Sequence, residues 1–244
     1  MTSTTRWTAG LSRRLPLIVV ALGLAGCCFG VTVSPAAAAN SIARALTAPV
    51  VGTSEQAGPV SGTVLVKVPG AHGFTPLTSI TLIPNGTELD TTNGRVRLRV
   101  ASGVPGVTNP VELNGGRFIV HQTAGSTPRT YFILSQPLTG CQPPVGPAHI
   151  ASAAGGLEAR PKGHKGPRSR HLWVTDHGGR FNTVGQYVST SVEGTTWLTA
   201  DTCIGSRVTV THGIVKVRDL ERRRTVTLHA GQSETDTDLA RRRG

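Results

Sequence analysis

Short stretches of alternating apolar and polar residues constrain the fold of this chain more than any other feature. Residues 63–68, TVLVKV, place valine at every second position, and residues 94–100, GRVRLRV, alternate arginine with an apolar residue. A period of two puts successive side chains on opposite faces of a β-strand. No segment shows the period of an amphipathic helix, so the pattern predicts an all-β protein.

Turn residues separate these stretches throughout the chain. The 244 residues include 30 glycines and 16 prolines, whereas aromatic residues make up only 4%. Residues 117–122, RFIVHQ, and 130–136, TYFILSQ, flank the segment TAGSTP and resemble a β-hairpin. We therefore expect a compact β-sandwich or roll of roughly ten short strands, with a core of Val, Leu, Ile and Thr.

The strand patterns fall into two halves. Residues 61–141 form the first half and residues 171–233 the second. Between them, residues 142–170 are rich in Pro, Gly, Ala and basic side chains without an apolar period, which predicts a disordered basic insertion. Residues 40–60 and 234–244 are expected to be flexible tails.

The first 39 residues have the order of a secretory signal peptide. A basic start is followed by an apolar run and then by small residues, which predicts cleavage after Ala39 and a secreted or envelope-associated protein. Two alternatives stay open. The sequence LAGC, ending at Cys27, matches a lipobox and would leave a lipoprotein anchored at that residue, and the apolar run is near the lower length limit for a retained membrane anchor.

The mature chain is basic. The whole sequence has 25 Lys and Arg against 13 Asp and Glu, and three of the arginines lie in the first 39 residues, which leaves a net charge of +9. Such a protein is attracted to anionic neighbours, including wall polymers and lipid head groups. The few, scattered aromatic residues are unsuited to base stacking, so specific nucleic-acid recognition is not expected.

Two cysteines, Cys141 and Cys203, remain outside the signal segment. An even pair in an exported protein is most simply a disulfide. Closing a loop of about 60 residues would stabilise the fold by about 4 kcal/mol on the chain-entropy model.

Several basic residues are candidates for binding a polyanion. In a strand, Arg95, Arg97 and Arg99 would lie on one face about 6.6 Å apart, and we call these three the arginine row. The alternative is that the row is a solvated face that keeps the sheet soluble. The clustered bases of the insertion are the other candidates: Arg160, Lys162, Lys165, Arg168 and Arg170.

The sequence resembles the two halves of a FecR-type domain. Residues 62–100 and 188–233 carry, in order, a strand with a Pro-Leu step, a Gly turn, a Gly-Thr pair with an aromatic residue, and a closing Ala-Gly-Gln. The matching elements are Pro76-Leu77, Gly86–Thr91, Gly194–Trp197, Val210–Val217 and Val226–Gln232. Glycines 86, 94, 194, 213 and 231 are expected at turns, where a positive φ carries no steric cost.

This resemblance implies a secreted β-domain that binds a partner and does not catalyse. The best-known members relay a signal across the inner membrane through a cytoplasmic segment, and only residues 1–14 precede the apolar run here. The iron-signalling role therefore does not carry over, and the chain looks like a stand-alone secreted variant. The expected role is a binding or sensor module of the cell envelope that contacts an anionic wall polymer or an envelope protein, without a cofactor or metal.

Two other functions are compatible with the sequence. The first is a purely structural wall-associated protein. The second is a cysteine transpeptidase of the sortase type, because Cys203 follows a strand and precedes Arg207 by four residues, with His149 upstream. A reactive thiolate would need such a cationic neighbour.

Overall fold

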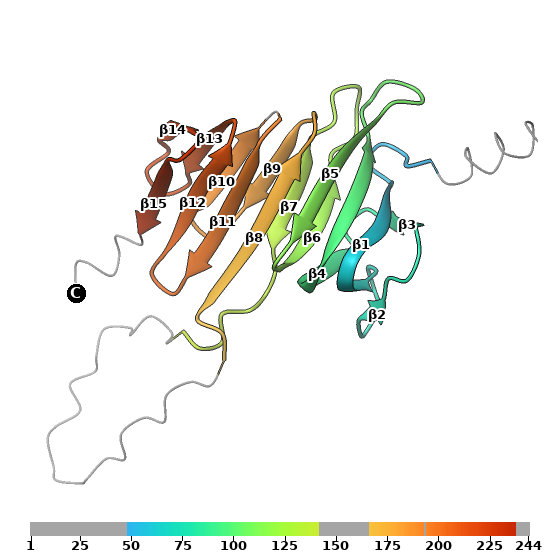
Figure 1. Cartoon of the computed structure of the whole chain (residues 1–244), viewed down its shortest axis with the longest axis horizontal. Helices are drawn as coiled ribbons and strands as arrows, with labels where there is room; N and C mark the ends of the chain where they lie inside the picture. The colour runs from blue at the N-terminus through green and yellow to red at the C-terminus, as the bar shows by residue number, and fades with distance from the viewer. Residues whose placement is uncertain (1–47, 142–165, 193, 238–244) are drawn as a thin grey trace, which may run out of the picture.

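The computed structural model describes residues 48–141, 166–192 and 194–237, which form fifteen β-strands and no helix (Figure 1). The all-β fold predicted from the sequence is confirmed. The strands are β1 (Ser54–Lys67), β2 (Thr75–Pro76), β3 (Thr81–Pro84), β4 (Glu88–Ala101), β5 (Thr108–Asn114), β6 (Arg117–Gln122), β7 (Thr130–Leu134), β8 (Ser169–Asp176), β9 (Phe181–Val184), β10 (Val188–Val192), β11 (Thr196–Thr202), β12 (Gly205–His212), β13 (Ile214–Asp219), β14 (Thr225–His229) and β15 (Ser233–Thr237).

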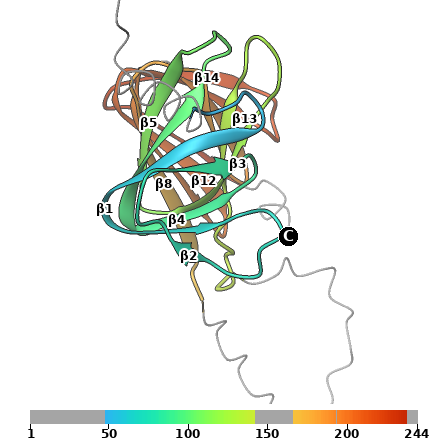
Figure 2. The same ribbon diagram turned by 90° about the vertical axis from the view of Figure 1, so that its right-hand side faces the viewer.

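The strands form one continuous sheet that folds back on itself into two layers. Their order is β14-β13-β10-β9-β7-β6-β4-β5-β8-β11-β12-β15, and Figure 1 shows β8, β11 and β12 in the front layer. The two layers meet through β4, which pairs with β6 over residues 88–90 and with β5 over residues 95–101. The end-on view of Figure 2 shows β1 crossing this end of the molecule, where it pairs with both parts of β4.

Two glycines lie where β1 and β4 bend together. Gly62 and Gly94 are register partners, and β1 has register shifts on both sides of Gly62. A Cβ atom on Gly94 would lie 2.4 Å from the carbonyl oxygen of Thr63, so no larger residue fits without a shift of the backbone. Gly94 therefore serves close packing inside a strand, and its expected place at a turn was wrong. The other four glycines named above do have a positive φ.

The two halves of the chain interlock in one hydrophobic core. β7 of the first half pairs with β9 of the second half, and this pair is parallel. The ring of Phe132 on β7 stacks on Phe181 of β9 at 5.7 Å and meets Phe118 edge-on, also at 5.7 Å. Across the layers, the buried indole of Trp197 donates a hydrogen bond of 3.1 Å to the hydroxyl of Thr183. The β7–β9 pair and the Phe132–Phe181 stack therefore join the two halves, whose buried residues belong to one core.

Several boundaries differ from the expected ones. Strand β1 begins at Ser54, so residues 54–60 belong to the folded body rather than to a tail, and residues 234–237 lie in β15. Strand β8 begins at Ser169, inside the expected insertion. The sheet has fifteen strands rather than ten because several segments read as turns form short strands. The hairpin of residues 117–136 is confirmed as β6 and β7.

The signal peptide, Ala39 and Cys27 lie outside the described residues. Among residues 48–141, 166–192 and 194–237, no helix has the length and hydrophobicity of a membrane span.

Candidate functional site: a cationic surface

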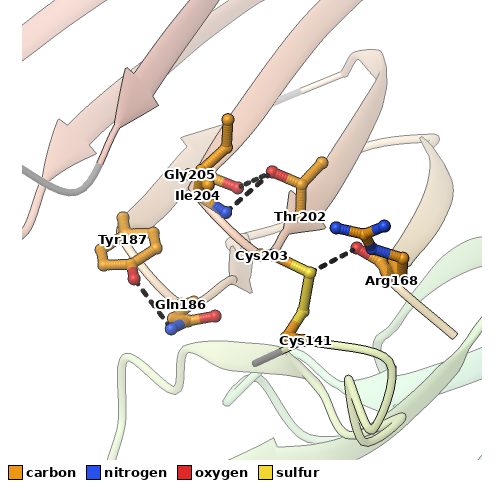
Figure 3. The surroundings of a disulfide bond; sticks show 8 residues. All are labelled: Cys141, Arg168, Gln186, Tyr187, Thr202, Cys203, Ile204 and Gly205. Atoms are coloured by element: carbon orange, nitrogen blue, oxygen red, sulfur yellow. Dashed lines mark hydrogen bonds between the residues drawn. A yellow bond between two sulfur atoms is a disulfide. The ribbon is translucent and has the colours of Figure 1, made fainter. Parts of the chain in front are cut away.

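The predicted disulfide between Cys141 and Cys203 is present, with their Cα atoms 5.3 Å apart (Figure 3). Cys203 lies in the turn between β11 and β12, and its Sγ lies 3.5 Å from the carbonyl oxygen of Arg168. Nearby, the amide of Gly140 donates to the carbonyl of Pro167 at 3.0 Å. The bond therefore joins the two halves of the chain where residues 140–141 lie beside residues 167–168.

Of the three residues that suggested a cysteine transpeptidase, the two described ones make other contacts. Cys203 is bonded to Cys141 and has no thiol in this state. Arg207 donates a hydrogen bond of 3.0 Å to the hydroxyl of Ser233. His149 lies outside the described residues.

The arginine row lies on the exposed face of β4, as its alternation predicted. Glu112 on the adjacent strand β5 accepts hydrogen bonds from Arg97 at 3.0 Å and from Arg95 at 3.2 Å. The hydrogen bond from Arg97 lowers the pKa of Glu112, and Arg95 acts in the same direction. Arg99 is exposed and has no ion pair among the described residues. One carboxylate thus offsets one of the three positive charges of the row and engages two of its arginines.

The basic residues of the insertion have different places. Arg160, Lys162 and Lys165 lie outside the described residues, and Arg168 is exposed beside the disulfide. Arg170 is largely buried. Its Nε donates to Asp201 at 2.8 Å, and a second nitrogen donates to the carbonyl of Gln136 at 3.1 Å.

Asp201 is a completely buried carboxylate that holds three segments together. Besides Arg170, it accepts a hydrogen bond of 2.9 Å from the backbone amide of Gln186 and one from the hydroxyl of Ser206. A buried charge needs such partners, because an unpaired one is strongly unfavourable. Arg170 is therefore committed to the fold.

Nearly all acidic residues of the described chain are either buried or ion-paired. Five are buried: Glu55, Asp176, Asp201, Asp219 and Asp236. Four more are in ion pairs with Lys or Arg: Glu88, Asp90, Glu112 and Glu234. Glu221 is exposed without an ion pair among the described residues, and the remaining three lie outside them: Glu158, Glu193 and Asp238.

Two of the buried carboxylates share one arginine. Arg222 donates to Asp236 at 2.6 Å and to Asp219 at 3.1 Å. Burial and the neighbouring Asp219 raise the pKa of Asp236. Burial also acts to raise the pKa of Asp219, but hydrogen bonds from Arg222 outweigh it, so that pKa is lowered. Arg222, which lies in the turn between β13 and β14, is therefore partly neutralised.

Glu55 is buried without any partner. It faces the interior from β1, opposite Ile83 of β3, and neither of its carboxylate oxygens has a hydrogen-bond partner among the described residues. Burial raises the pKa of Glu55 to about 7, although its own backbone amide acts in the opposite direction. At neutral pH this residue therefore contributes only part of a negative charge.

The basic residues have the opposite distribution. Eight of them have no ion pair with another described residue: Arg99, Arg129, Arg168, Arg180, Arg207, Lys216, Arg218 and Arg223. All eight are exposed. The surface is thus more cationic than the composition alone suggests.

Three of these unpaired cations line one surface pocket of about 430 Å³, which we call the cationic groove. Arg129, Arg180 and Lys216 supply its charge. Asn182 and Ser191 add polar groups, and Val192 and Ile214 add apolar surface: these seven residues come from four separate parts of the chain.

The pairing of the strands explains how the groove forms. Arg129 precedes β7 and Arg180 precedes β9, and these parallel strands start in register, with the amide of Thr130 donating to the carbonyl of Arg180 at 3.0 Å. Arg129 and Arg180 therefore lie side by side just before two adjacent strands, and both are exposed on the same outer face. Lys216 of β13 is the register partner of Ser191 on β10. Alternation places both on this outer face as well.

No carboxylate of the surrounding strands faces the groove. Strands β6, β7, β9, β10, β13 and β14 contain one acidic residue, Asp219, and it is buried. Glu193 follows Val192 in the chain and lies outside the described residues. Like charges that lie opposite each other on adjacent strands destabilise a sheet, and here no described acid relieves the repulsion between Arg129 and Arg180.

Sequence reasoning missed the groove. Arg129, Arg180 and Lys216 are far apart in the chain and belong to no charge cluster. The parallel pairing of β7 with β9 brings Arg129 beside Arg180, and the pairing of β10 with β9 and β13 adds Lys216. A parallel pair between two separate halves leaves no local signal.

The described residues contain no group of three or more His, Cys, Asp or Glu side chains placed to hold a metal ion. A scan against family models, a search of curated proteins and a search of solved structures each found no match. The argument about function therefore depends on the charge and geometry of the surface.

Proposed function

We propose that this protein is a secreted, non-enzymatic module of the cell envelope, of the FecR-like type, that binds an anionic envelope polymer. The observation that carries the proposal is the separation of charge: carboxylates are buried or ion-paired, whereas eight basic side chains are unpaired among the described residues. Exposed ion pairs add little to folding stability, so these eight cations stay available to an anionic ligand.

The compact body supports a binding role. The disulfide and the interlocked core hold the outer faces on a rigid scaffold. Rigid surfaces bind with little loss of conformational entropy, because their side-chain positions are largely set before the ligand arrives. A purely structural wall-associated protein is the alternative, and it would require no separation of charge.

The test is retention of the mature, oxidised protein on purified, anionic wall polymer over a series of salt concentrations. Electrostatic binding should weaken steeply, by about tenfold or more between about 50 and about 200 mM salt, because counterions are released when charges pair. The same polymer with its anionic groups chemically blocked is the control. Retention that is unchanged by salt or by blocking would favour the structural alternative, and no retention at low salt would contradict the proposal.

A further inference from the structure

We propose that the cationic groove is a binding site for the phosphate group of a sugar- or polyol-phosphate unit within a phosphodiester polymer. This inference rests on the proposed function and names the site and the ligand that the function would use. The groove is distinct from the arginine row and from the basic insertion, which were the candidates visible in the sequence.

The charges of the groove favour a compact anion. Arg129 and Arg180 start two adjacent strands, and Lys216 completes the lining from a third element. Guanidinium groups bind phosphate through two parallel N–H···O hydrogen bonds, and lysine adds a mobile point charge. An anion between them would relieve the repulsion between like charges that the unliganded protein retains.

The other lining residues suit a sugar or polyol next to the phosphate. Asn182 is buried and its Nδ2 donates to the carbonyl of Thr130 at 3.3 Å, so its Oδ1 can accept, and the exposed hydroxyl of Ser191 can exchange, hydrogen bonds with hydroxyl groups. Ile214, half exposed on the same face, offers apolar surface to the carbon atoms of the unit. A volume of about 430 Å³ is in the range of small-ligand pockets and large enough for one such unit.

The surrounding face favours a polymer over a free ion. Arg218 lies two residues beyond Lys216 on β13, exposed and without an ion pair among the described residues. Thr227 of β14 is the register partner of Lys216, so its hydroxyl lies next to Lys216 on the neighbouring strand. A chain with a phosphate in the groove could place further phosphates along this face.

The experiment measures binding of a poly(glycerol phosphate) oligomer to the mature, oxidised protein by calorimetry at about 150 mM salt. The double variant R180Q/K216Q should lose at least about tenfold in affinity, because each removed cation takes away charge-assisted hydrogen bonds. The control variant R207Q/R223Q removes the same charge from exposed residues that belong neither to the groove nor to the arginine row, and it should change the affinity by less than about threefold. Thermal unfolding of both variants checks that they fold.

Several results would overturn the inference. Equal losses in the two double variants would mean that phosphate binds diffusely, which leaves the proposed function intact. Tight binding of inorganic phosphate alone, or of phosphatidylglycerol vesicles but not the oligomer, would assign the groove to another ligand. Binding by an E193Q variant but not by the wild-type protein would mean that Glu193 neutralises the groove. Failure of the wild-type protein to bind any anionic polymer would contradict both proposals.

Discussion

The arginine row and the cationic groove are two basic surfaces that differ in two ways: how visible they are in the sequence, and how many of their cations are in ion pairs. The row is visible in seven consecutive residues, yet Glu112 on the adjacent strand binds two of its three arginines. The groove leaves no pattern in the sequence, yet none of its three cations has an ion pair among the described residues. Clustering of charge along a chain is therefore a poor guide to free charge on a folded surface.

The difference between the two surfaces comes from the carboxylates. Glu112 lies beside the row and pairs with two of its arginines, whereas Asp219, the one acid in the strands around the groove, is buried. Three variants of acidic residues test this comparison, because each acid has a distinct place: buried and paired, buried and unpaired, or paired on the surface.

The largest effect is expected for Asp201, because its carboxylate is committed to the interior. Asp201→Ala should lower the free energy of unfolding by about 3–5 kcal/mol, since it leaves the buried Arg170 and the amide of Gln186 without their acceptor. Chemical denaturation of the oxidised protein measures this change.

Glu221 provides the matched control for Asp201. It is exposed and has no ion pair among the described residues, so Glu221→Ala should change the free energy of unfolding by less than about 0.5 kcal/mol. If the two substitutions had similar effects, the buried Asp201 would not stabilise the fold more than an exposed acid does. The burial of acids would then not explain why the two surfaces differ.

A smaller effect, which depends on pH, is expected for Glu55. Its pKa is about 7 in the folded protein, above the ordinary value of 4.5, so the folded state binds this proton more tightly than the unfolded state does. The cost of burying the residue is absent below about pH 4.5, grows as the pH rises, and reaches about 3 kcal/mol above pH 7.

Glu55→Gln should remove this dependence. At pH 8 the free energy of unfolding of the variant should be higher than that of the wild-type protein by up to about 3 kcal/mol, and at pH 4 the two values should be similar. Asp219 and Asp236 also have shifted pKa values, and the difference between variant and wild type cancels their contribution. A constant difference at all pH values would show that the pKa of Glu55 is the same in the folded and unfolded states.

Local patterns predicted much of this fold. Alternation predicted the exposed face of β4 and the hairpin of β6 and β7, and cysteine content predicted the disulfide. The short strand β2 was missed, and so was the extension of β1 to Ser54, because residues 54–60 contain Gly58 and Pro59, which usually mark turns. There, pairing with β3 and β4 outweighs the local preference.

The candidate site could not be predicted in the same way. Whether a cation is free depends on which acid lies opposite it, and that depends on strand order. Arg170 illustrates this: in the sequence it ends a basic cluster, but in the fold it reaches the buried Asp201, 31 residues further along the chain. Only the three-dimensional pairing distinguishes it from Arg180, ten residues later, which stays unpaired.

The smallest effect on stability, and the most direct test of the comparison, is expected for Glu112→Gln. The substitution should lower the free energy of unfolding by less than about 1 kcal/mol, because exposed ion pairs contribute little. It should also release Arg95 and Arg97, so that the row gains affinity for the poly(glycerol phosphate) oligomer by a few-fold and the salt dependence of binding becomes steeper by up to about two released ions.

Glu234→Gln, which releases the single cation Arg224, is the control and should give a smaller gain. If Glu112→Gln left the affinity and the salt dependence unchanged, pairing with an acid would not be what separates the row from the groove, and the shape of the groove would have to account for the whole difference.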